Sequence, residues 1–304
     1  MQVVITSLSD NLYLESRKKL NNSALRFGAT QVQSRSFEEL KKSDFYLDNK
    51  EILDKPKGLG YWLWKPYIIL KALESIEHGD IVIYSDCGIE IIKSIIPLID
   101  ICKDQDPVLL FGNGNFTNAT WTKRDCFVLM NCDAESYWYS PHCDAAFSIF
   151  RKCDLSIQFL NEWLNYGKDK RIITDDTNEC GLQNLPEFIE HRWDQSILSL
   201  LAQKYQLTLY RMPTQFGNHY KTPGLRVKKE INCVNQLDQT PVDHYSVIPY
   251  YNSDYAQLLN HHREKSVIEA AHQTNNTPSR KIVTNKPLIN FNLAKQLKKL
   301  NKLF

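Results

Sequence analysis

Short apolar runs typical of strands alternate with segments of helical period over the N-terminal part of this chain, and this alternation constrains the fold most. A strand is expected at residues 2–6, then a helix that ends near Gly28, and a buried strand from Ile81 to Tyr84 precedes a helix at about residues 93–102. Alternation of this kind favours a mostly parallel sheet with helices on both faces. The predicted fold class is therefore α/β.

The same patterns extend through the middle of the chain. Strands are expected in the runs "PVLLF" and "AAFSIFRK", with a Gly/Asn-rich loop, "GNGN" at residues 112–115, between them. An apolar helix with Pro in its first turn is predicted at residues 66–77, and amphipathic helices are predicted at residues 153–167 and 193–205. We interpret residues 1–222 as one domain.

The character of the sequence changes after about Thr222, and we interpret residues 223–304 as a C-terminal extension. Residues 250–265 read as a helix, and the terminal segment is basic and amphipathic. Its apolar face carries Leu293, Leu297, Leu300 and Phe304, with four lysines elsewhere. Such a segment suits peripheral contact with an anionic inner membrane leaflet, or equally a terminal helix packed on its own domain.

The charge balance excludes one class of partner. With 37 Lys and Arg against 35 Asp and Glu, the net charge is +2, so the chain lacks the basic field that nucleic-acid binding requires. The N-terminus shows no secretory pattern, and no apolar stretch has the roughly 18 residues of a bilayer span. We expect a cytoplasmic protein without nucleic-acid partners.

The stretch "YSDCGIE" places Asp86 just after the buried strand. In open α/β sheets, ligands bind at the carboxyl ends of the strands, and a carboxylate there suits a hard divalent cation that holds a diphosphate. Glu90 is near enough in sequence to assist. The alternative is that Asp86 caps a following helix.

Four aromatic residues surround one cation in "GLGYWLWKPYIILKAL", at the start of the helix expected from Pro66. One interpretation is that Lys65, fixed among Tyr61, Trp62 and Trp64, pairs with a diphosphate in a partly dry cleft. The other is that the tryptophans are core residues and Lys65 reaches outward to solvent.

The stretch "HRWDQSILSLL" places Asp194 and Gln195 at the start of a helix whose apolar side faces inward. A carboxylate and an amide at this point suit contact with a sugar, where the carboxylate balances developing positive charge. The alternative is that Asp194 only caps the helix.

Further polar residues are candidates for saccharide contacts. Trp121 suits a platform under a sugar ring, with Lys123 beside it, although a Trp at the edge of a core is the commoner case. His142 and Asp144 are further candidates for contact with a saccharide. His219 follows a glycine and is a candidate metal ligand, although a lone His seldom is one.

Taken together and in order, five blocks resemble a family of bacterial GT-A type glycosyltransferases that build O-antigen and capsular polysaccharides: "GLGYWLWKPYIILKAL", "GDIVIYSDCG", "WTKRDCF", "AAFSIFRK" and "FIEHRWDQSILSLL". The likeness covers roughly residues 1–220. It implies a Rossmann-like GT-A sheet that binds a UDP-sugar through Mn²⁺ or Mg²⁺.

The resemblance also implies roles for particular residues. Asp86 is the first acid of a DxD-type motif, although Gly88 stands where the second acid is usual, and Glu90 or His219 would complete the metal shell. The nucleotide-sugar contacts implied are Lys65, Tyr61, Trp64, Ser85 and Asp86. Asp194 and Gln195 match the Asp-Gln pair of retaining families.

The function expected is transfer of a hexosyl group, galactosyl being one candidate, from a UDP-sugar to a saccharide or lipid-linked acceptor in lipopolysaccharide O-antigen or capsule synthesis. Two alternatives stay open: a carbohydrate-binding protein without catalysis, and a metal-dependent nucleotide-sugar hydrolase.

Overall fold

The computed structural model describes residues 1–217, 232–234, 241–243, 250, 252–262 and 264. The chain divides into two compact units, residues 1–267 and 268–304. Every described residue belongs to the first unit. The basic amphipathic segment at the end of the predicted C-terminal extension lies outside the described residues, as does His219.

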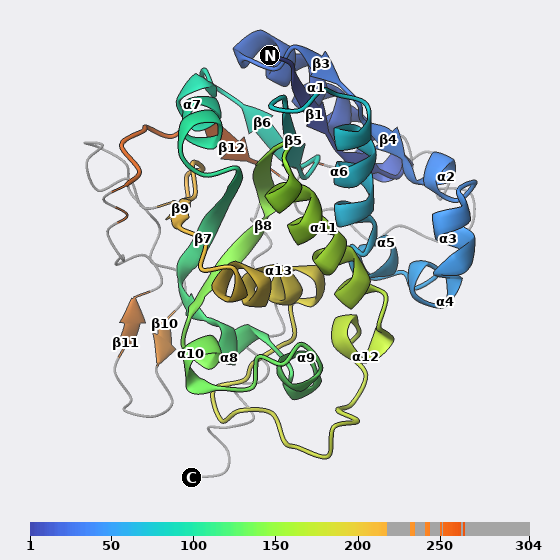
Figure 1. The fold of residues 1–304 in the computed structure, drawn as a ribbon, viewed down its shortest axis with the longest axis vertical. Helices are drawn as coiled ribbons and strands as arrows, with labels where there is room; N and C mark the ends of the chain where they lie inside the picture. Colours follow the sequence, from blue (N-terminus) through green and yellow to red (C-terminus); the bar gives the residue numbers. More distant parts are fainter. Residues whose placement is uncertain (218–231, 235–240, 244–249, 251, 263, 265–304) are drawn as a thin grey trace, which may run out of the picture. The chain divides into compact units, whose positions relative to one another are not determined.

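A mixed sheet of six strands forms the centre of the described part (Figure 1). Its order is β3-β1-β5-β8-β7-β9, and five strands run in one direction while β8 runs against them. The predicted α/β class with a mostly parallel sheet is therefore confirmed. The strands of this sheet are β1 (Val3–Thr6), β3 (Gln31–Val32), β5 (Ile81–Ser85), β7 (Val108–Thr117), β8 (Pro141–Arg151) and β9 (Leu209–Arg211).

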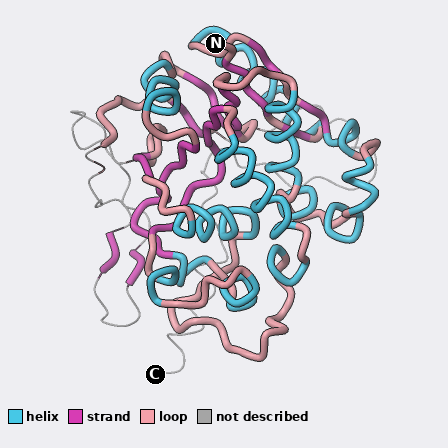
Figure 2. The backbone as a smooth tube through the Cα atoms, viewed as in Figure 1, coloured by secondary structure: helices cyan, strands magenta, loops and turns pink. Residues whose placement is uncertain are grey.

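Helices cover both faces of the sheet. Successive side chains of a strand point to opposite faces, so apolar residues on both faces need a covering layer. In β5, Val82 and Tyr84 join the core under one set of helices, and Ile81 and Ile83 join the core under the other. Figure 2 shows the cyan helices packed around the magenta strands. The first set is α6 (Trp64–Glu74), α11 (Asp154–Gly167) and α13 (Trp193–Lys204), and the second is α1 (Leu14–Phe27) and α7 (Ile96–Asp104).

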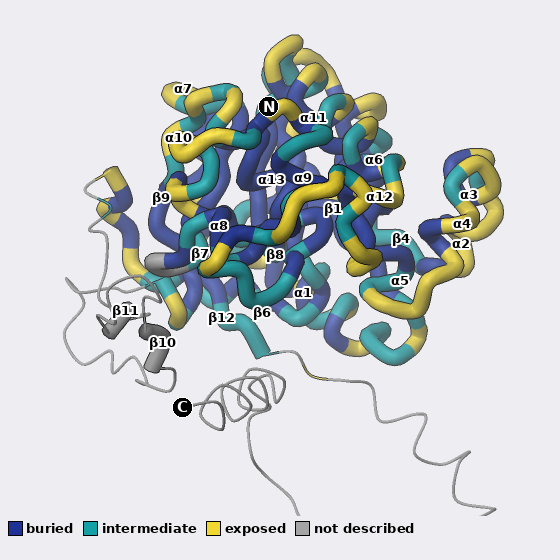
Figure 3. Tube along the Cα trace, turned by 90° about the horizontal axis from the view of Figure 1, so that it is seen from below, coloured by how far each residue is buried: buried dark blue, intermediate teal, exposed yellow. Residues whose placement is uncertain are grey.

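Burial follows this layering. In Figure 3 the central strands and α13 are dark blue, whereas α7 and α10 carry exposed yellow segments. The other helices are short, and none in the described ranges is long and apolar enough to cross a membrane. They are the 3₁₀ helix η1 (Asn11–Tyr13), α2 (Phe37–Leu40), α3 (Asp44–Asp48), α4 (Lys50–Leu53), α5 (Gly58–Tyr61), α8 (Asn118–Trp121), α9 (Arg124–Leu129), α10 (Glu135–Trp138) and α12 (Lys170–Ile173).

A bulge in β8 breaks the regular ladder beside the end of β5. Leu109 of β7 pairs with Ile149, but Phe111, two residues later, pairs with Asp144, so extra residues of β8 loop out between them. Bulges of this kind re-aim backbone groups and are frequent beside active sites. Here the bulge contains Ala145, whose carbonyl oxygen accepts a hydrogen bond from a side chain.

Three expectations from the sequence are corrected by the structure. The "GNGN" stretch lies within β7, because the long ladder with β8 carries it past the expected loop. Residues 252–262 contain no helix and instead supply β12 (Leu259–His261), which pairs with β6 (Ile89–Ile91). That pairing brings the chain after residue 222 back onto the first unit, which ends at 267. The remaining strands are β2 (Leu8–Ser9), β4 (Arg35–Ser36), β10 (Asn232–Val234) and β11 (Pro241–Asp243).

Candidate active site

Lys65 lies in the first turn of α6 and is buried between two carboxylates. Its Nζ is 3.1 Å from Oδ2 of Asp194 and 3.4 Å from Oδ1 of Asp86, and it donates a hydrogen bond of 3.0 Å to the carbonyl of Ala145. The ammonium group therefore has one hydrogen-bond acceptor, the carbonyl of Ala145, and two ion-pair partners, the carboxylates of Asp86 and Asp194. The structure thus unites the three residues that the sequence predicts for one cleft, and the ammonium does not reach solvent as the alternative interpretation expected.

The electrostatics of this cluster combine burial with opposite charge. Burial by itself lowers the pKa of Lys65, but the charges of Asp194 and then Asp86 outweigh it, so the net pKa is raised and the side chain stays protonated. Burial raises the pKa of Asp194 to about 7, against the opposing charge of Lys65. A permanent cation therefore faces a carboxyl group that titrates near neutral pH, which is typical of functional sites.

Asp86 lies at the carboxyl end of β5 and is about one third exposed. Its Oδ1 accepts a hydrogen bond of 2.5 Å from the hydroxyl of Tyr84, two residues earlier and on the same face of the strand. Tyr84 is fully buried, and burial raises its pKa well above the usual value. The next element is the strand β6, so the alternative that Asp86 caps a following helix is wrong.

Asp194 is the second residue of α13 and does not cap it, because the N-cap position is Arg192. Its carboxylate is 5 % exposed and points to Lys65, while its backbone carbonyl accepts a hydrogen bond of 3.1 Å from Nε1 of Trp163. The neighbouring Gln195 is half-buried, and its Nε2 donates 2.6 Å to the carbonyl of Cys143 in β8. Both side chains are therefore held by contacts from other elements.

The aromatic residues next to Lys65 in the sequence are packed in the core. Trp64 is buried, and its Nε1 donates to the carbonyl of Gly58. Tyr61 is buried, with its ring centroid 6.5 Å from that of Trp193. Ser85 is fully buried, and its hydroxyl donates to the backbone oxygen of Asp86. A contact of Tyr61, Trp64 or Ser85 with a nucleotide-sugar stays a prediction.

The residues predicted to contact the acceptor separate into two groups. Asp144 is half-buried, and its charge is among those that raise the pKa of Lys65, so it belongs to the cluster. Trp121 is 5 % exposed and lies under the guanidinium of Arg192, at 4.2 Å, so it offers no open platform here. Lys123 is buried and donates to the carbonyl of Asp176.

His142 is fully buried in β8. Its Nδ1 is 2.9 Å from Oδ1 of Asn118 and donates to it, while its Nε2 has no hydrogen-bond partner among the described residues. Burial, with nearby positive charges, lowers its pKa well below the usual value, so the ring is neutral. Contact of His142 with an acceptor stays a prediction.

The predicted metal ligands are not gathered as expected. Glu90 pairs with Lys19 of α1 at 3.0 Å, and His219 lies outside the described residues. Within the ranges that the structure describes, no three His, Cys, Asp or Glu side chains are grouped to hold a metal ion. Asp86 alone remains, and its Oδ2 accepts no hydrogen bond from a described residue. One carboxylate oxygen suits a cation that is otherwise held by phosphate oxygens and water.

Some residues of the site escape the sequence patterns. The role of the Ala145 carbonyl depends on a bulge that no local motif predicts. Tyr84 was visible only as one apolar residue of a buried strand, although its spacing from Asp86 places both on one face. Asp175, which contacts Trp193 beside Asp194, lies in a loop that has no strand or helix pattern.

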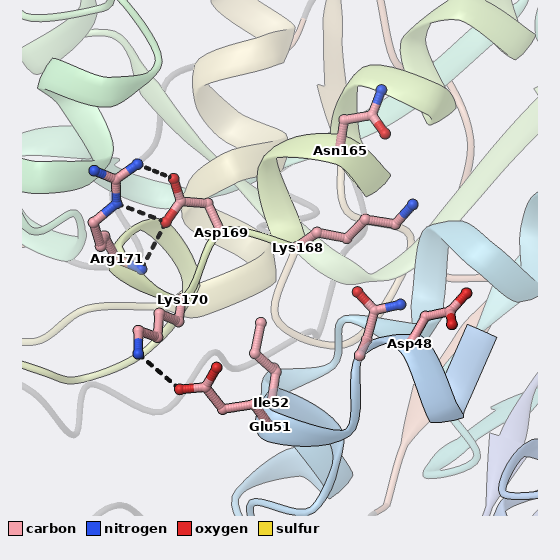
Figure 4. Close-up of a pocket in the computed structure, with 9 residues that line it drawn as sticks. Asp48, Glu51, Ile52, Asn165, Lys168, Asp169, Lys170 and Arg171 are labelled. Carbon is pink, nitrogen blue, oxygen red and sulfur yellow. Dashed lines mark hydrogen bonds and ion pairs between the residues drawn. The ribbon is translucent and has the colours of Figure 1, made fainter. Parts of the chain in front are cut away.

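A separate groove of about 520 Å³ lies between the α3–α4 and α11–α12 segments (Figure 4). It contains none of Lys65, Asp86 and Asp194. Two ion pairs form between residues that line the groove, Lys170 with Glu51 and Arg171 with Asp169. Nine residues line the groove: Asp48, Asn49, Glu51, Ile52, Asn165, Lys168, Asp169, Lys170 and Arg171.

No protein-family model matches the chain, and no curated protein is significantly similar to it. Among solved structures, the bifunctional glycosyltransferase WbbM in its apo form aligns with a TM-score of 0.42 and 12% identity, over 71% of this chain and 40% of WbbM. This chain thus spans less than half the length of WbbM. Apo mouse xyloside xylosyltransferase 1 aligns with a TM-score of 0.43 and 11% identity, over 86% of this chain and 97% of that one.

Proposed function

We propose that this protein is a glycosyltransferase that moves a hexosyl group from a UDP-sugar to a hydroxyl of a saccharide acceptor. The observation that carries this proposal is the meeting of Lys65, Asp86 and Asp194 at the carboxyl end of β5, where ligands of open α/β sheets bind. The resemblance of the sequence to GT-A type enzymes supports the same reaction.

Glycosyl transfer passes through a state in which the sugar ring carries positive charge and the leaving UDP carries negative charge. Asp194 suits stabilisation of the sugar ring, because a buried carboxylate acts on nearby charge more strongly than an exposed one. Gln195 is held through its Nε2 by the carbonyl of Cys143, and we propose that its Oε1 accepts a hydrogen bond from a sugar hydroxyl. With this Asp-Gln pair, transfer with retention of configuration is proposed.

Lys65 takes a different role from the one the sequence predicts. Its side chain is only 4% exposed and its ammonium is enclosed by the Ala145 carbonyl and the carboxylates of Asp86 and Asp194, so we propose that these groups, and not a diphosphate, are its partners. We assign it to positioning: it holds the two acids at fixed places and keeps Asp194 ionised closer to neutral pH. A buried cation between two carboxylates also avoids the cost of two uncompensated buried charges.

A divalent cation, Mn²⁺ or Mg²⁺, fits this site as a partner of the donor. Asp86 would hold it through its partly exposed carboxylate, with the diphosphate oxygens and water completing the shell. The cation would offset the charge of the leaving UDP. Glu90 does not join Asp86 in this arrangement, because it is paired with Lys19.

The donor, the acceptor and the location are proposed from the resemblance of the sequence to GT-A type glycosyltransferases. The donor is a UDP-hexose, with UDP-galactose as one candidate, and the acceptor is a saccharide or lipid-linked saccharide of O-antigen or capsule synthesis. A cytoplasmic site of action, with peripheral contact to the inner leaflet through the basic terminal segment, fits such an acceptor.

The proposal is tested by incubating the protein with a panel of UDP-sugars, Mn²⁺ or Mg²⁺ and saccharide acceptors, and following UDP and product mass. We expect UDP release and a heavier saccharide that both depend on the acceptor. Asp86→Asn and Asp194→Asn should lower both by orders of magnitude, whereas Asp104→Asn, at an exposed pair with Lys103, should not.

The same assay separates the two rival functions. Release of free sugar without any acceptor would identify a hydrolase. Saccharide binding without consumption of any UDP-sugar would identify a binding protein, and either outcome would overturn the transferase proposal.

A further inference from the structure

The backbone before Lys65 adopts an unusual conformation. Five consecutive residues, Gly58 to Trp62, have φ between 54° and 91°, which is the left-handed region. Hydrogen bonds from Tyr61 N to Lys57 O and from Trp62 N to Gly58 O close one left-handed turn. Only glycine adopts this conformation at no cost, so Leu59, Tyr61 and Trp62 are strained.

A further strained residue directly precedes Asp194, the partner of Lys65 in the ion pair. Trp193 has φ of 50° and lies directly before Asp194. Strained backbone of this kind persists only where surrounding contacts hold it, and it gathers at functional sites. Each half of the Lys65–Asp194 pair thus follows a strained segment.

Four residues join these two segments, and we name them the Trp193 clamp: Lys57, Trp62, Asp175 and Trp193. The indole of Trp193 lies 5.1 Å from the ring of Trp62, centroid to centroid, and Nζ of Lys57 is 4.0 Å from the Trp193 ring centroid. Nε1 of Trp193 donates to Oδ1 of Asp175 at 2.5 Å, and Oδ2 of Asp175 pairs with Lys57 at 2.9 Å.

The clamp is coupled to the ion pair through short stretches of chain. The amide of Lys65 donates to the carbonyl of Trp62, so the position of the Trp62 backbone sets the first turn of α6. The left-handed φ of Trp193 lets its indole lie against Trp62 while the next side chain, Asp194, points to Lys65. A shift of the Trp193 ring would therefore move the Asp194 carboxylate.

We propose that Trp193, held by the clamp, is a positioning residue that fixes the Asp194 carboxylate against Lys65. This inference rests on the proposed function, in which Asp194 faces the sugar. The clamp acts through the geometry of the two segments, and its four members are not among the proposed substrate contacts. Its charged members are open to solvent, since the side chains of Lys57 and Asp175 are 43% and 40% exposed, so they can be changed without opening the core.

The test compares wild-type protein with Asp175→Asn, Trp193→Phe and a matched control, Glu74→Gln. The control removes an exposed ion pair of 2.8 Å with Lys71 on the same helix as Lys65. UDP release gives kcat and KM, and thermal unfolding gives the Tm. In parallel, ¹³C NMR of aspartate-labelled protein follows the titration of Asp194, which is assigned by its loss in Asp194→Asn.

We expect kcat to fall by about 10- to 100-fold in Trp193→Phe, as for a displacement of about 1 Å, with a smaller loss in Asp175→Asn. KM for the donor and the Tm of Asp175→Asn should stay near wild type, and Asp175→Glu should recover part of the rate because it restores a carboxylate. The NMR titration of Asp194 should move in both clamp variants and not in Glu74→Gln.

The two readouts keep this inference distinct from the proposed function. If wild-type protein consumes no UDP-sugar, the proposed function fails, while a moved Asp194 titration in the clamp variants still supports positioning. If the titration of Asp194 is the same in wild type, Asp175→Asn and Trp193→Phe, the positioning role is overturned whatever the activity.

Discussion

Two regions of this molecule each contain an ion pair between a lysine and a carboxylate, one exposed to solvent and one buried. In the groove of Figure 4, Lys170 and Glu51 approach to 2.7 Å, with side chains 52% and 70% exposed. At the end of β5, Lys65 and Asp194 are farther apart, at 3.1 Å, with side chains 4% and 5% exposed. The longer pair has the stronger Coulombic attraction, because water screens the charges of the shorter one.

The direction of the pKa shifts reflects the same difference. In the groove, hydrogen bonding to Arg171 is the main reason that the pKa of Asp169 is lowered. At the buried site, burial is the main reason that the pKa of Asp194 is raised, and Lys65 only opposes it. For these two carboxylates, burial of Asp194 and hydrogen bonding of Asp169 shift the pKa in opposite directions.

The largest effect is expected from Asp194→Asn. Loss of the carboxylate should lower kcat by about 10³-fold, or about 4 kcal/mol, because charge stabilisation in a dry site has few substitutes. Steady-state assays of UDP release would measure this. Glu51→Gln, in the groove, should leave kcat unchanged, and equal losses in both variants would contradict the distinction between the two regions.

Lys65→Met should destabilise the fold by about 3–5 kcal/mol at pH 8, because it leaves two carboxylates without their cation. In the wild type, Asp194 has a folded pKa of about 7, above its unfolded value, so its contribution to stability is present at low pH and lost as the pH rises through 7. Without Lys65 that pKa rises further. Urea unfolding should thus show a smaller deficit at pH 5 than at pH 8, and a deficit independent of pH would contradict the account.

Two substitutions, Gly60→Ala and Gly79→Ala, compare a glycine that is closely surrounded with one that has free space around it. A Cβ at Gly60 would lie 2.5 Å from Cα of Leu53, whereas a Cβ at Gly79 would meet nothing within 4 Å, and both residues have φ near 90°. Gly79→Ala therefore reports the backbone cost alone, about 1 kcal/mol, and Gly60→Ala should cost about 2–3 kcal/mol or more. Urea unfolding at one pH would measure both, and similar losses would show that the confined site relaxes.

The pH dependence of the rate distinguishes the buried acid from exposed ones. Asp194 acts as a carboxylate, so activity should fall about tenfold per pH unit below a midpoint near 7 and level off above it. A pH profile of kcat at saturating donor would show this limb. A midpoint near 4, the usual value of an exposed aspartate, would mean that Asp194 is hydrated or not required.

The smallest effect is expected from Lys170→Met in the groove. Its pair with Glu51 is solvent-exposed and screened by water, so removal should leave both the free energy of unfolding and kcat close to those of the wild type. Urea unfolding and UDP release would measure the two quantities. A loss of stability as large as that of Lys65→Met would contradict the difference between the exposed and the buried ion pair.

Local pattern sufficed for much of the fold. β5 and α13 were predictable because an apolar run or a helical period is carried by adjacent residues, and these two elements fix where Asp86 and Asp194 stand along the chain. The continuation of β7 through "GNGN" was not predictable, since pairing with β8 overrides the glycines. The strand β12 was missed for the same reason, because its partner β6 is remote in sequence.

The sequence by itself determined the α/β alternation and the residues that stand at the carboxyl end of β5 and the start of α13. Only the tertiary structure decided what those residues do to one another: that Lys65 is enclosed by two acids and a bulge carbonyl, and that Trp193 is fixed by Asp175 and Lys57. The reason is physical. Strand and helix preferences act between neighbouring residues, whereas burial, and with it the strength of charge, is set by chain segments that meet only when the whole domain packs.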